Sequence, residues 1–411
     1  MRVDEVIEGI HRAERARVLA GLIGVLRDFD LAEESLQDAY IAALEAWPRV
    51  GIPENPAGWL MTAARRKAID RLRRSAALDR RHRQWGELAI AWIAPNPAEP
   101  IADDRLRLIF TCCHPSLAVE SQVALTLRTL CGLTTAEVAH AFMISEMALG
   151  QRLVRAKRKI RDSRIPYRVP LPSEHLERLD AVLAVVALVF NAGYLPVDSD
   201  RLVRVDLCDE ALRLALLLTE LLPEEPEPLA LAALLNLHDS RRAARSNPAG
   251  RPLTLEEQDR ELWDRSQILV GLEFLKRAVC LGRPGPYALK ANIAAVHATT
   301  RQAVATNWIN IVALYDQLLI LEPSPIVQLN RSVAVAMAGS PQDGLQLIDD
   351  RHLADALDEY HLYHLTRADL LRRCGRRAEA AAAYERGREL TRNQAEHDFL
   401  EARLRQISTN D

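Results

Sequence analysis

Aromatic residues are scarce in this chain of 411 residues, where Phe, Trp and Tyr together make up 5%. Runs that alternate Val, Ile or Thr with polar residues are few, whereas Ala and Leu are abundant, and this pattern argues against a β-sandwich or a β-barrel. The 17 glycines and 21 prolines are spread out and form no low-complexity tract. With 49% hydrophobic and 27% charged residues, the chain can bury a large core. We therefore expect an all-α protein of two or three domains.

Cysteines, signal sequences and membrane segments are also rare or absent. Six cysteines occur and none forms a C-x-x-C pair, so neither a disulfide framework nor a structural zinc site is expected. The first ten residues contain three acids, where a secretory signal peptide has a basic and then an apolar stretch. The longest apolar run, residues 181–190, is far shorter than the roughly 20 residues that cross a membrane. We expect a cytoplasmic protein without metal or cofactor.

The formal net charge of −3 conceals an uneven distribution. Residues 1–169 contain 26 Lys/Arg and 21 Asp/Glu, a net charge of +5, whereas the remainder contains 27 and 35, a net charge of −8. Residues 65–83 hold nine Lys/Arg and two acids, and residues 152–168 hold eight Lys/Arg and one acid. Basic clusters on helices attract polyanions. The front part is therefore predicted to bind nucleic acid, and the alternative is a solvated basic surface.

Hydrophobic spacing and prolines predict the order of helices and domains. Residues 3–47 are expected to be helical, with Asp30 as the N-cap of a second helix that ends at the three prolines of residues 48–56. Another helix is expected from Pro56 to about Arg74. The predicted domains are a first helical domain at 1–83, a linker at 84–104, a second helical domain at 105–165 and a helical, repeat-like domain at 173–411.

Residues 134–161 have the pattern of a helix-turn-helix. Thr134 and Glu137 form a capping box that opens a short helix, and Ser145 caps a second helix through Leu149 and Ile160. In this motif the second helix enters the major groove of DNA, with the residues near its N-terminus on the base edges. Gln151 and Arg152 are suited to base contacts, and Arg155, Lys157 and Arg158 to phosphates or adjacent bases.

The segment beyond residue 172 is expected to consist of helices separated by breaks that contain Pro and Gly. Helix pairs of this length are typical of stacked helical hairpins. The last pair resembles a tetratricopeptide repeat, with its small residues and turn glycine at Ala368, Leu371, Gly375, Ala378, Ala380, Ala383, Tyr384 and Leu390.

Residues 31–74 resemble the promoter-melting domain of bacterial sigma factors, above all the extracytoplasmic-function (ECF) class. The matching residues are 32–38 (AEESLQD), Trp47, Trp59, Leu60 and 64–74 (ARRKAIDRLRR). Residues 106–161 are similar to the second DNA-binding domain of this class, at 133–139 (LTTAEVA) and 152–157 (RLVRAK). The rest resembles a subgroup with a long C-terminal extension of tetratricopeptide-like helices, at 188–194 (LVFNAGY) and 329–336 (LNRSVAVA).

The resemblance implies core RNA polymerase and promoter DNA as partners, and a role for each of three groups of residues. The helix that grips the polymerase clamp carries Leu36, Gln37, Asp38 and Tyr40. The loop at residues 48–56 captures a flipped base of the −10 element, and the residues that follow the melted strand are Arg65, Arg66, Lys67, Arg71 and Arg74. The −35 element is read by the helix with Ala148, Gln151, Arg152, Arg155, Lys157 and Arg158. The C-terminal helices are expected to regulate the front part or to bind a protein.

Two functions from other classes stay open at this point. A helix-turn-helix regulator acting without polymerase accounts for residues 134–161, but not for the helices at 31–74. An enzyme in the rear half is the second alternative, although no phosphate-binding loop, dinucleotide fingerprint or nucleophile elbow occurs.

Several single residues are expected to be structural. Cys112 and Cys113 lack zinc-site spacing and are expected in the core. His361 and His364 lie three residues apart with no carboxylate partner in the sequence pattern, so packing is expected. Trp47 is expected in the core in preference to stacking on bases. The same expectation applies to Trp59.

Overall fold

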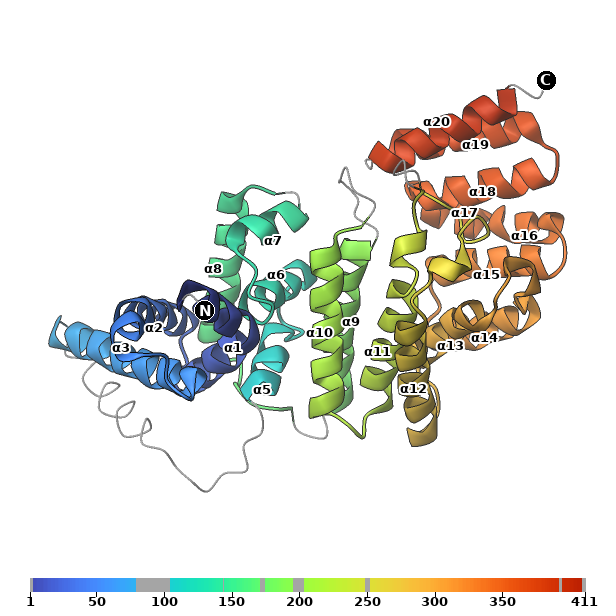
Figure 1. Cartoon of the computed structure of the whole chain (residues 1–411). Helices are drawn as coiled ribbons and strands as arrows, with labels where there is room; N and C mark the ends of the chain where they lie inside the picture. Colours follow the sequence, from blue (N-terminus) through green and yellow to red (C-terminus); the bar gives the residue numbers. More distant parts are fainter. Residues whose placement is uncertain are drawn as a thin grey trace. The chain divides into compact units, whose positions relative to one another are not determined.

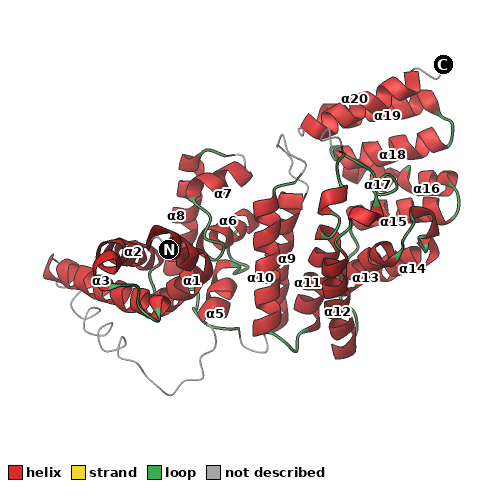
Figure 2. Cartoon of the chain, in the orientation of Figure 1, coloured by secondary structure: helices red, strands yellow, loops and turns green. Residues whose placement is uncertain are grey.

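The computed structural model describes residues 3–78, 104–142, 144–170, 174–194, 203–247, 252–391 and 394–408. Within these ranges the secondary structure is helical, with an isolated bridge between Ser246 and Pro252 and no strand (Figure 2). This confirms the expected all-α class. No helix in the described ranges has the length and apolar character needed to cross a membrane. The predicted linker lies outside the described residues, apart from its last residue.

The chain divides into two compact units, Met1–Val186 and Ala187–Asp411. The division falls inside helix α9 (His175–Tyr194), whose residues up to Val186 belong to the first unit and whose remaining residues belong to the second. The four domain limits expected from the sequence stay a prediction.

The first unit begins with three helices that pack on one another, α1 (Val3–Leu26), α2 (Phe29–Val50) and α3 (Pro56–Leu78) (Figure 1). Their amphipathic spacing places one apolar face of each helix in a shared core. The buried side chains include Leu19, Leu22, Ile23, Leu36, Trp47 and Leu60.

The expected N-cap of α2 was wrong, whereas its expected end within residues 48–56 is confirmed. The N-cap is Asp28, whose Oδ1 accepts from the Leu31 N–H at 3.0 Å, whereas Asp30 lies in the first turn. Pro48 does not end the helix, because the loss of one N–H donor still lets the backbone continue for a short distance beyond it. The helix ends at Gly51, where φ is +87° and the N–H donates to the Trp47 carbonyl.

Four more helices complete the two expected DNA-binding elements: α5 (Asp104–Cys112), α6 (Val119–Thr129), α7 (Thr135–Phe142) and α8 (Glu146–Asp162). The turn after α6 contains Gly132, whose φ of +75° favours glycine. The expected caps are confirmed. The Thr134 N–H donates to Glu137 and the Glu137 N–H to the Thr134 hydroxyl, and the Ala148 N–H donates to the Ser145 hydroxyl at 3.1 Å.

The second unit is a series of helices in which neighbours along the chain pack together (Figure 1). The α-helices are α10 (Val205–Leu221), α11 (Pro226–Asp239), α12 (Arg265–Leu281), α13 (Pro286–Thr299), α14 (Trp308–Leu321), α15 (Pro325–Ala338), α16 (Pro341–Ile348), α17 (Arg351–Leu357), α18 (His361–Arg373), α19 (Arg377–Leu390) and α20 (Gln394–Ser408). Short 3-10 helices are η1 (Arg242–Ala244), η2 (Arg260–Leu262) and η3 (Ala303–Ala305). Four of the α-helices start with Pro in the first turn, as expected from the breaks in the sequence.

The last hairpin, α18 and α19, has the small-residue packing expected of a tetratricopeptide-like pair. Ala368 and Ala380 are fully buried, and a Cβ at Gly387 would collide with the side chain of Leu365. Gly375 has a φ of +76° in the turn between the helices.

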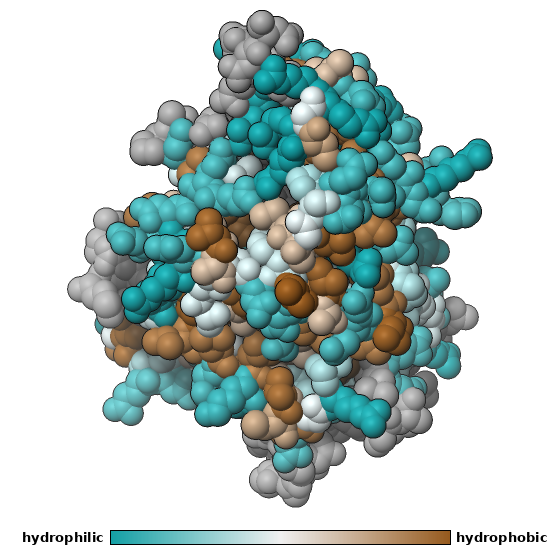
Figure 3. Space-filling view, turned by 90° about the vertical axis from the view of Figure 1, so that its right-hand side faces the viewer, coloured by the Kyte–Doolittle hydropathy of each residue, from teal (hydrophilic) through white to brown (hydrophobic). Residues whose placement is uncertain are grey.

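On the side of the molecule shown in Figure 3, apolar patches alternate with hydrophilic surface.

One expectation about this hairpin was wrong. His361 does have a carboxylate partner, because its Nε2 lies 3.2 Å from the Glu396 carboxylate of α20. His364 is buried, and its Nε2 lies 2.6 Å from the Asp358 carbonyl oxygen. The His361 imidazole therefore connects α18 to α20, and the His364 imidazole connects α18 to the residue that follows α17.

Candidate nucleic-acid interface

A pocket of about 830 Å³ lies where the loop after α2 meets the first turns of α3. The loop is shorter than expected, because α2 continues to Val50 and α3 starts at Pro56. The residues that line the pocket are Ala42, Pro53, Glu54, Asn55, Gly58, Trp59, Thr62, Ala63, Arg66, Lys67 and Asp70. The structure therefore brings the predicted base-capturing loop together with two of the predicted strand-binding cations.

The five basic residues predicted on α3 do not form a single exposed stripe. Arg66 and Lys67 are exposed, and Arg65 is half-buried. Arg71 is engaged by α2, since its Nη2 lies 2.8 Å from the Asp38 Oδ2 and its Nε donates to the same oxygen at 3.1 Å. Arg71 also pairs with Glu34. The side chain of Arg74 lies outside the described residues.

The predicted polymerase-binding residues of α2 differ in exposure. Leu36 is only 3% exposed and belongs to the core, so its side chain cannot present an outer surface. Gln37 is exposed, and Asp38 is half-buried against Arg71. Tyr40 is also half-buried, and burial raises the pKa of its hydroxyl to about 12. The polar side chains of Gln37, Asp38 and Tyr40 are therefore at least partly exposed to solvent, whereas the neighbouring Leu36 is buried.

The exposed face of α8 carries Ala148, Gln151, Arg155 and Arg158, which recur at helical spacing. The Arg155 Nε donates to the Gln151 carbonyl at 3.2 Å, and Arg158 pairs with Asp162 at 3.1 Å. Leu149, Leu153 and Ile160 are buried on the opposite face, as expected. The face that the sequence predicted to meet DNA is therefore open to solvent.

Arg152 and Gly150 show how the same helix is held. Arg152 is half-buried, with its guanidinium carbon 5.5 Å from the centroid of the Phe142 ring on α7. At Gly150 an added Cβ would meet no atom within 4 Å. Packing therefore does not require this glycine, which costs a helix interior roughly 1 kcal/mol relative to alanine.

Lys157, a member of the predicted DNA-binding set, has an ammonium group that does not face solvent. Its side chain is 12% exposed, and its Nζ lies 2.9 Å from both Asp30 Oδ1 and Glu33 Oε2 of α2. Burial disfavours the charge, but the two carboxylates outweigh that effect and raise the pKa of Lys157. Lys157 thus joins the helix-turn-helix to the first helical domain.

Arg15 of α1 makes a second connection between the same two parts, and sequence reasoning missed it. Its Nη1 donates to the Arg128 carbonyl at 3.1 Å and to the Thr129 carbonyl at 3.0 Å, at the end of α6. Its Nη2 lies 3.9 Å from Glu33. Arg15 is buried, and burial lowers the pKa of its guanidinium. A charged residue at a buried position of α1 is the signal that could have identified it.

A smaller pocket of about 370 Å³ lies between these parts. One side is formed by Arg15, Glu33, Leu36, Gln37 and Tyr40, and the other by Arg128, Gly132, Thr134 and Thr135. The predicted polymerase-binding face of α2 therefore looks toward the turn between α6 and α7.

Tyr167 also ties the first unit together and was not predicted. Its hydroxyl donates to the Ala20 carbonyl of α1 at 2.7 Å and is 3.2 Å from the Asp104 carbonyl of α5. Arg178 of α9 adds a hydrogen bond to the Phe110 carbonyl. The segment after α8 is therefore part of the packed unit.

Cys112, Cys113 and Trp47 lie in the core, as expected, whereas Trp59 is half-buried and lines the pocket beside α3. Cys112 and Cys113 are buried next to threonine hydroxyls, and burial raises the pKa of the Cys113 thiol to about 12. Trp47 is 2% exposed and packs edge-to-face on Trp59, with ring centroids 5.5 Å apart. The described part of the chain contains no group of three or more His, Cys, Asp or Glu placed to hold a metal ion.

Three family models match successive parts of the chain. Sigma-70 region 2 matches residues 10–77, which hold most of α1, all of α2 and nearly all of α3. Sigma-70 region 4 matches residues 107–160, from α5 to α8. A family of unknown function (DUF6596) matches residues 178–279, from α9 to α12.

Similar proteins decide the family. The ECF RNA polymerase sigma factor SigK of Mycolicibacterium vanbaalenii is 31% identical over 169 residues, which cover 38% of this chain and 81% of the relative. The chain belongs to the ECF RNA polymerase sigma factors. The probable ECF sigma factor SigI of Mycobacterium tuberculosis is 27% identical over 180 residues, covering 43% of this chain and 61% of the relative. The resemblance seen in the sequence is confirmed.

The long extension of this ECF sigma factor is shared with a further relative. An uncharacterised protein of Rhizobium meliloti is 40% identical over 402 residues, which cover 95% of this chain and 93% of the relative. The similarity therefore continues through the helical C-terminal region, well beyond regions 2 and 4.

Proposed function

We propose that this ECF sigma factor binds core RNA polymerase in the cytoplasm and directs it to promoters, without catalysing a step itself. The observation that carries the proposal is the presence of regions 2 and 4, in that order, in one chain. A helix-turn-helix regulator that acts without polymerase would explain α7 and α8, but it leaves α2, its following loop and α3 without a role.

Region 2 is proposed to melt the −10 element. The pocket beside α3 is wide enough for a nucleobase, and Trp59 and Asn55 lie in its wall. Arg66 and Lys67 line the same pocket and place positive charge where the phosphates of the separated strand would pass. Unstacking a base costs a few kcal/mol, which such a pocket offsets. We assign Arg65 and Arg74 to the same strand, and Arg71 to it once Asp38 is released.

The test of this function is run-off transcription with core polymerase. The Arg66→Ala, Lys67→Ala double variant is expected to slow promoter opening about five- to tenfold, since each exposed phosphate contact contributes a fraction of the binding energy. A template with a pre-melted bubble should restore the rate. Glu54→Gln, a change in the same pocket that removes no cation, is the matched control. An equal loss on duplex and bubble templates would contradict the melting role.

Region 4 is proposed to read the −35 element with the exposed face of α8. Gln151 and Arg155 are exposed and have side chains suited to base edges, and we assign the exposed Arg158 to a phosphate. Ala148 offers a methyl group for an apolar contact with a base. Arg152 can reach the groove only beside the Phe142 ring on which it rests.

Core polymerase is proposed to bind through Gln37, Asp38 and Tyr40, with Leu36 supporting the helix from inside. The turn between α6 and α7 lies across a small pocket from this face, and Lys157 is held by α2. We therefore propose that the observed contact between regions 2 and 4 is a closed state. Its separation would free the polymerase face and Lys157 together, and Lys157 would then join the DNA-binding set.

The C-terminal helical region is proposed to regulate the front part or to bind a protein partner. The net charge of −8 beyond residue 169 against +5 before it favours an electrostatic effect. A truncation at residue 165 would remove Tyr167 and Arg178, whose hydrogen bonds to the Ala20 and Phe110 carbonyls help to hold the first unit together. The truncation is therefore better placed after Val186.

Truncation after Val186 is expected to change transcription by threefold or more relative to the full chain, since removal of about half of the protein removes either a mask or a support. More transcription would identify the extension as an inhibitor, and less as a positive element. Circular dichroism and binding to core polymerase control for the fold of the fragment. Equal activity of the two proteins would contradict regulation in either direction.

A further inference from the structure

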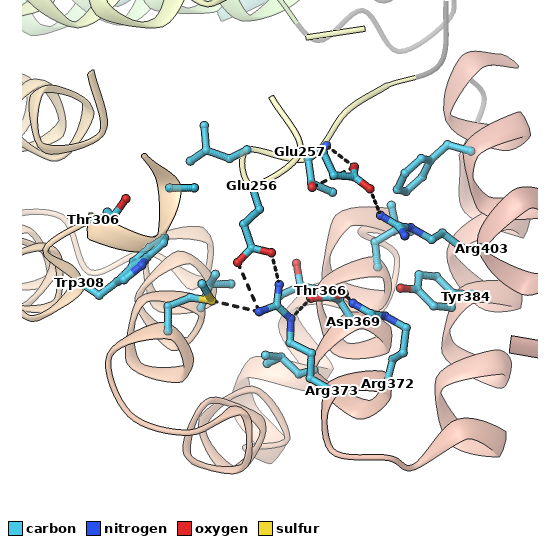
Figure 4. A pocket seen from close by; sticks show the side chains of 18 of the residues that line it. Glu256, Glu257, Thr306, Trp308, Thr366, Asp369, Arg372, Arg373, Tyr384 and Arg403 are labelled. Atoms are coloured by element: carbon cyan, nitrogen blue, oxygen red, sulfur yellow. Dashed lines mark hydrogen bonds and ion pairs between the residues drawn. The ribbon is translucent and has the colours of Figure 1, made fainter. Parts of the chain in front are cut away.

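The C-terminal unit contains a pocket of about 450 Å³ that regions 2 and 4 do not use (Figure 4). Its walls come from residues 254–260, from η3 and α14, from α15, and from the last three helices. The volume lies in the range of small-molecule sites. The pocket belongs to one unit, so its walls are positioned by the packing of neighbouring helices.

Much of the wall is apolar. Trp308 lies on one side of the pocket in Figure 4, and Leu365, Phe399 and Met337 contribute from α18, α20 and α15. An aromatic or aliphatic body of a ligand would therefore leave water for a hydrophobic surface.

Two buried polar groups in this wall have a donor without a partner in the described part of the chain. Thr306 is 7% exposed, and its hydroxyl makes no hydrogen bond. Arg260 is 6% exposed, and its Nε is also unpartnered, although its Nη1 donates to the His297 and Thr300 carbonyls at 2.8 and 2.6 Å. Buried donors of this kind cost stability unless an acceptor satisfies them.

Three other arginines around the pocket are paired with acids, whereas the Arg260 guanidinium lies over the Trp263 ring, with its carbon 4.8 Å from the ring centroid. Arg373 pairs with Glu256 at 2.8 Å, and Arg403 pairs with Glu257 at 2.8 Å (Figure 4). Arg372 likewise pairs with Asp369. Burial lowers the pKa of Arg260, the neighbouring Arg241 and Arg265 lower it further, and no carboxylate is among the groups that act on it.

We propose that this pocket binds a small amphipathic monocarboxylate, with the carboxylate at Arg260 and Thr306 and the apolar body against Trp308. An ionised carboxylate only accepts hydrogen bonds, so it suits an N–H and an O–H donor together. The acids Glu256, Glu257 and Asp369 line the same pocket and disfavour a second negative charge on the ligand.

The test uses the full-length chain with 4-phenylbutyrate as the probe and its neutral amide, 4-phenylbutyramide, as the matched compound. Calorimetry and the fluorescence of the tryptophans report binding. The carboxylate is expected to bind with a Kd of about 1 mM or below, as a ligand of this size permits. The amide should bind at least about tenfold more weakly, because a neutral group gains less from the Arg260 charge.

Variants distinguish binding at this pocket from non-specific hydrophobic binding. Thr306→Val removes the unpartnered hydroxyl at similar size and should weaken carboxylate binding about tenfold without destabilising the free chain. Thr299→Val, which changes a hydroxyl outside the pocket, is its control. Ala303→Trp should fill the pocket and abolish binding, whereas Val304→Trp, at a neighbouring residue that is 91% exposed, should not. Equal binding of acid and amide, unchanged binding by Thr306→Val, or no binding of the acid would overturn the proposal.

Discussion

Glu33→Gln is expected to open the contact between regions 2 and 4 and to tighten binding of the free sigma factor to a −35 duplex about 10- to 100-fold. Glu33 is 15% exposed and lies between two cations, Lys157 at 2.9 Å and Arg15 at 3.9 Å. Loss of one partner from a largely buried ion pair costs roughly 3–5 kcal/mol, and partial exposure reduces this figure here. The closed state loses that stabilisation, whereas the open state does not.

Anisotropy of a labelled duplex and the radius of gyration in solution would measure this opening. The radius should increase as the two regions separate. Glu34→Gln is the matched control, because Glu34 is an exposed neighbour that pairs with Arg71 inside region 2 and not with region 4. An unchanged radius together with unchanged DNA affinity for Glu33→Gln would show that the contact does not restrain region 4.

Local features of this chain could be predicted from its sequence because their causes are local. The Thr134–Glu137 capping box and the Ser145 cap need only residues three apart, and both were expected and found. The end of α2 was expected within residues 48–56, and the packing of Trp47 and the conformation of Gly51 place it at Val50, two residues beyond Pro48. The expected N-cap, Asp30, was wrong, because the carboxylate of Asp28, two residues earlier, accepts the Leu31 N–H.

Long-range pairing is the feature of the candidate site that the sequence could not show. The local sequence shows Lys157 as one of a cluster of basic residues, but its partners Asp30 and Glu33 lie 127 and 124 residues away in sequence. The same holds for Arg71 and Asp38, which were assigned to DNA and to polymerase and which pair with each other across the α2–α3 hairpin. The exposed face of α8 was predictable, since helical spacing separates its polar side from Leu149 and Leu153.

The C-terminal unit is expected to lose about 4 kcal/mol of stability between pH 7 and pH 5 through two half-buried histidines. Burial, together with nearby arginines, lowers the pKa of His238 on α11 to about 3 and that of His297 on α13 to about 4. An unfolded histidine has a pKa of about 6.5, so below that pH the unfolded state binds more protons than the folded one. Stability is therefore present above pH 6.5 and is lost as the pH falls toward the folded pKa values, by roughly 2 kcal/mol per histidine at pH 5.

Urea unfolding at pH 7 and pH 5, with hydrogen exchange of the α11 and α13 peptides as the readout, measures this loss in the unit concerned. His238→Gln and His297→Gln should each remove about half of the difference between the two pH values, because each removes one titrating group while other acid-sensitive groups stay the same. His352→Gln, at an exposed position of α17, should leave the difference unchanged. If both histidine variants keep the full difference in stability between pH 7 and pH 5, carboxylates and not these imidazoles govern the acid response.

The two histidines line a common pocket of about 460 Å³ and act on each other electrostatically, so protonation of one should lower the affinity of the other for a proton. The double variant should then recover less than the sum of the two single effects.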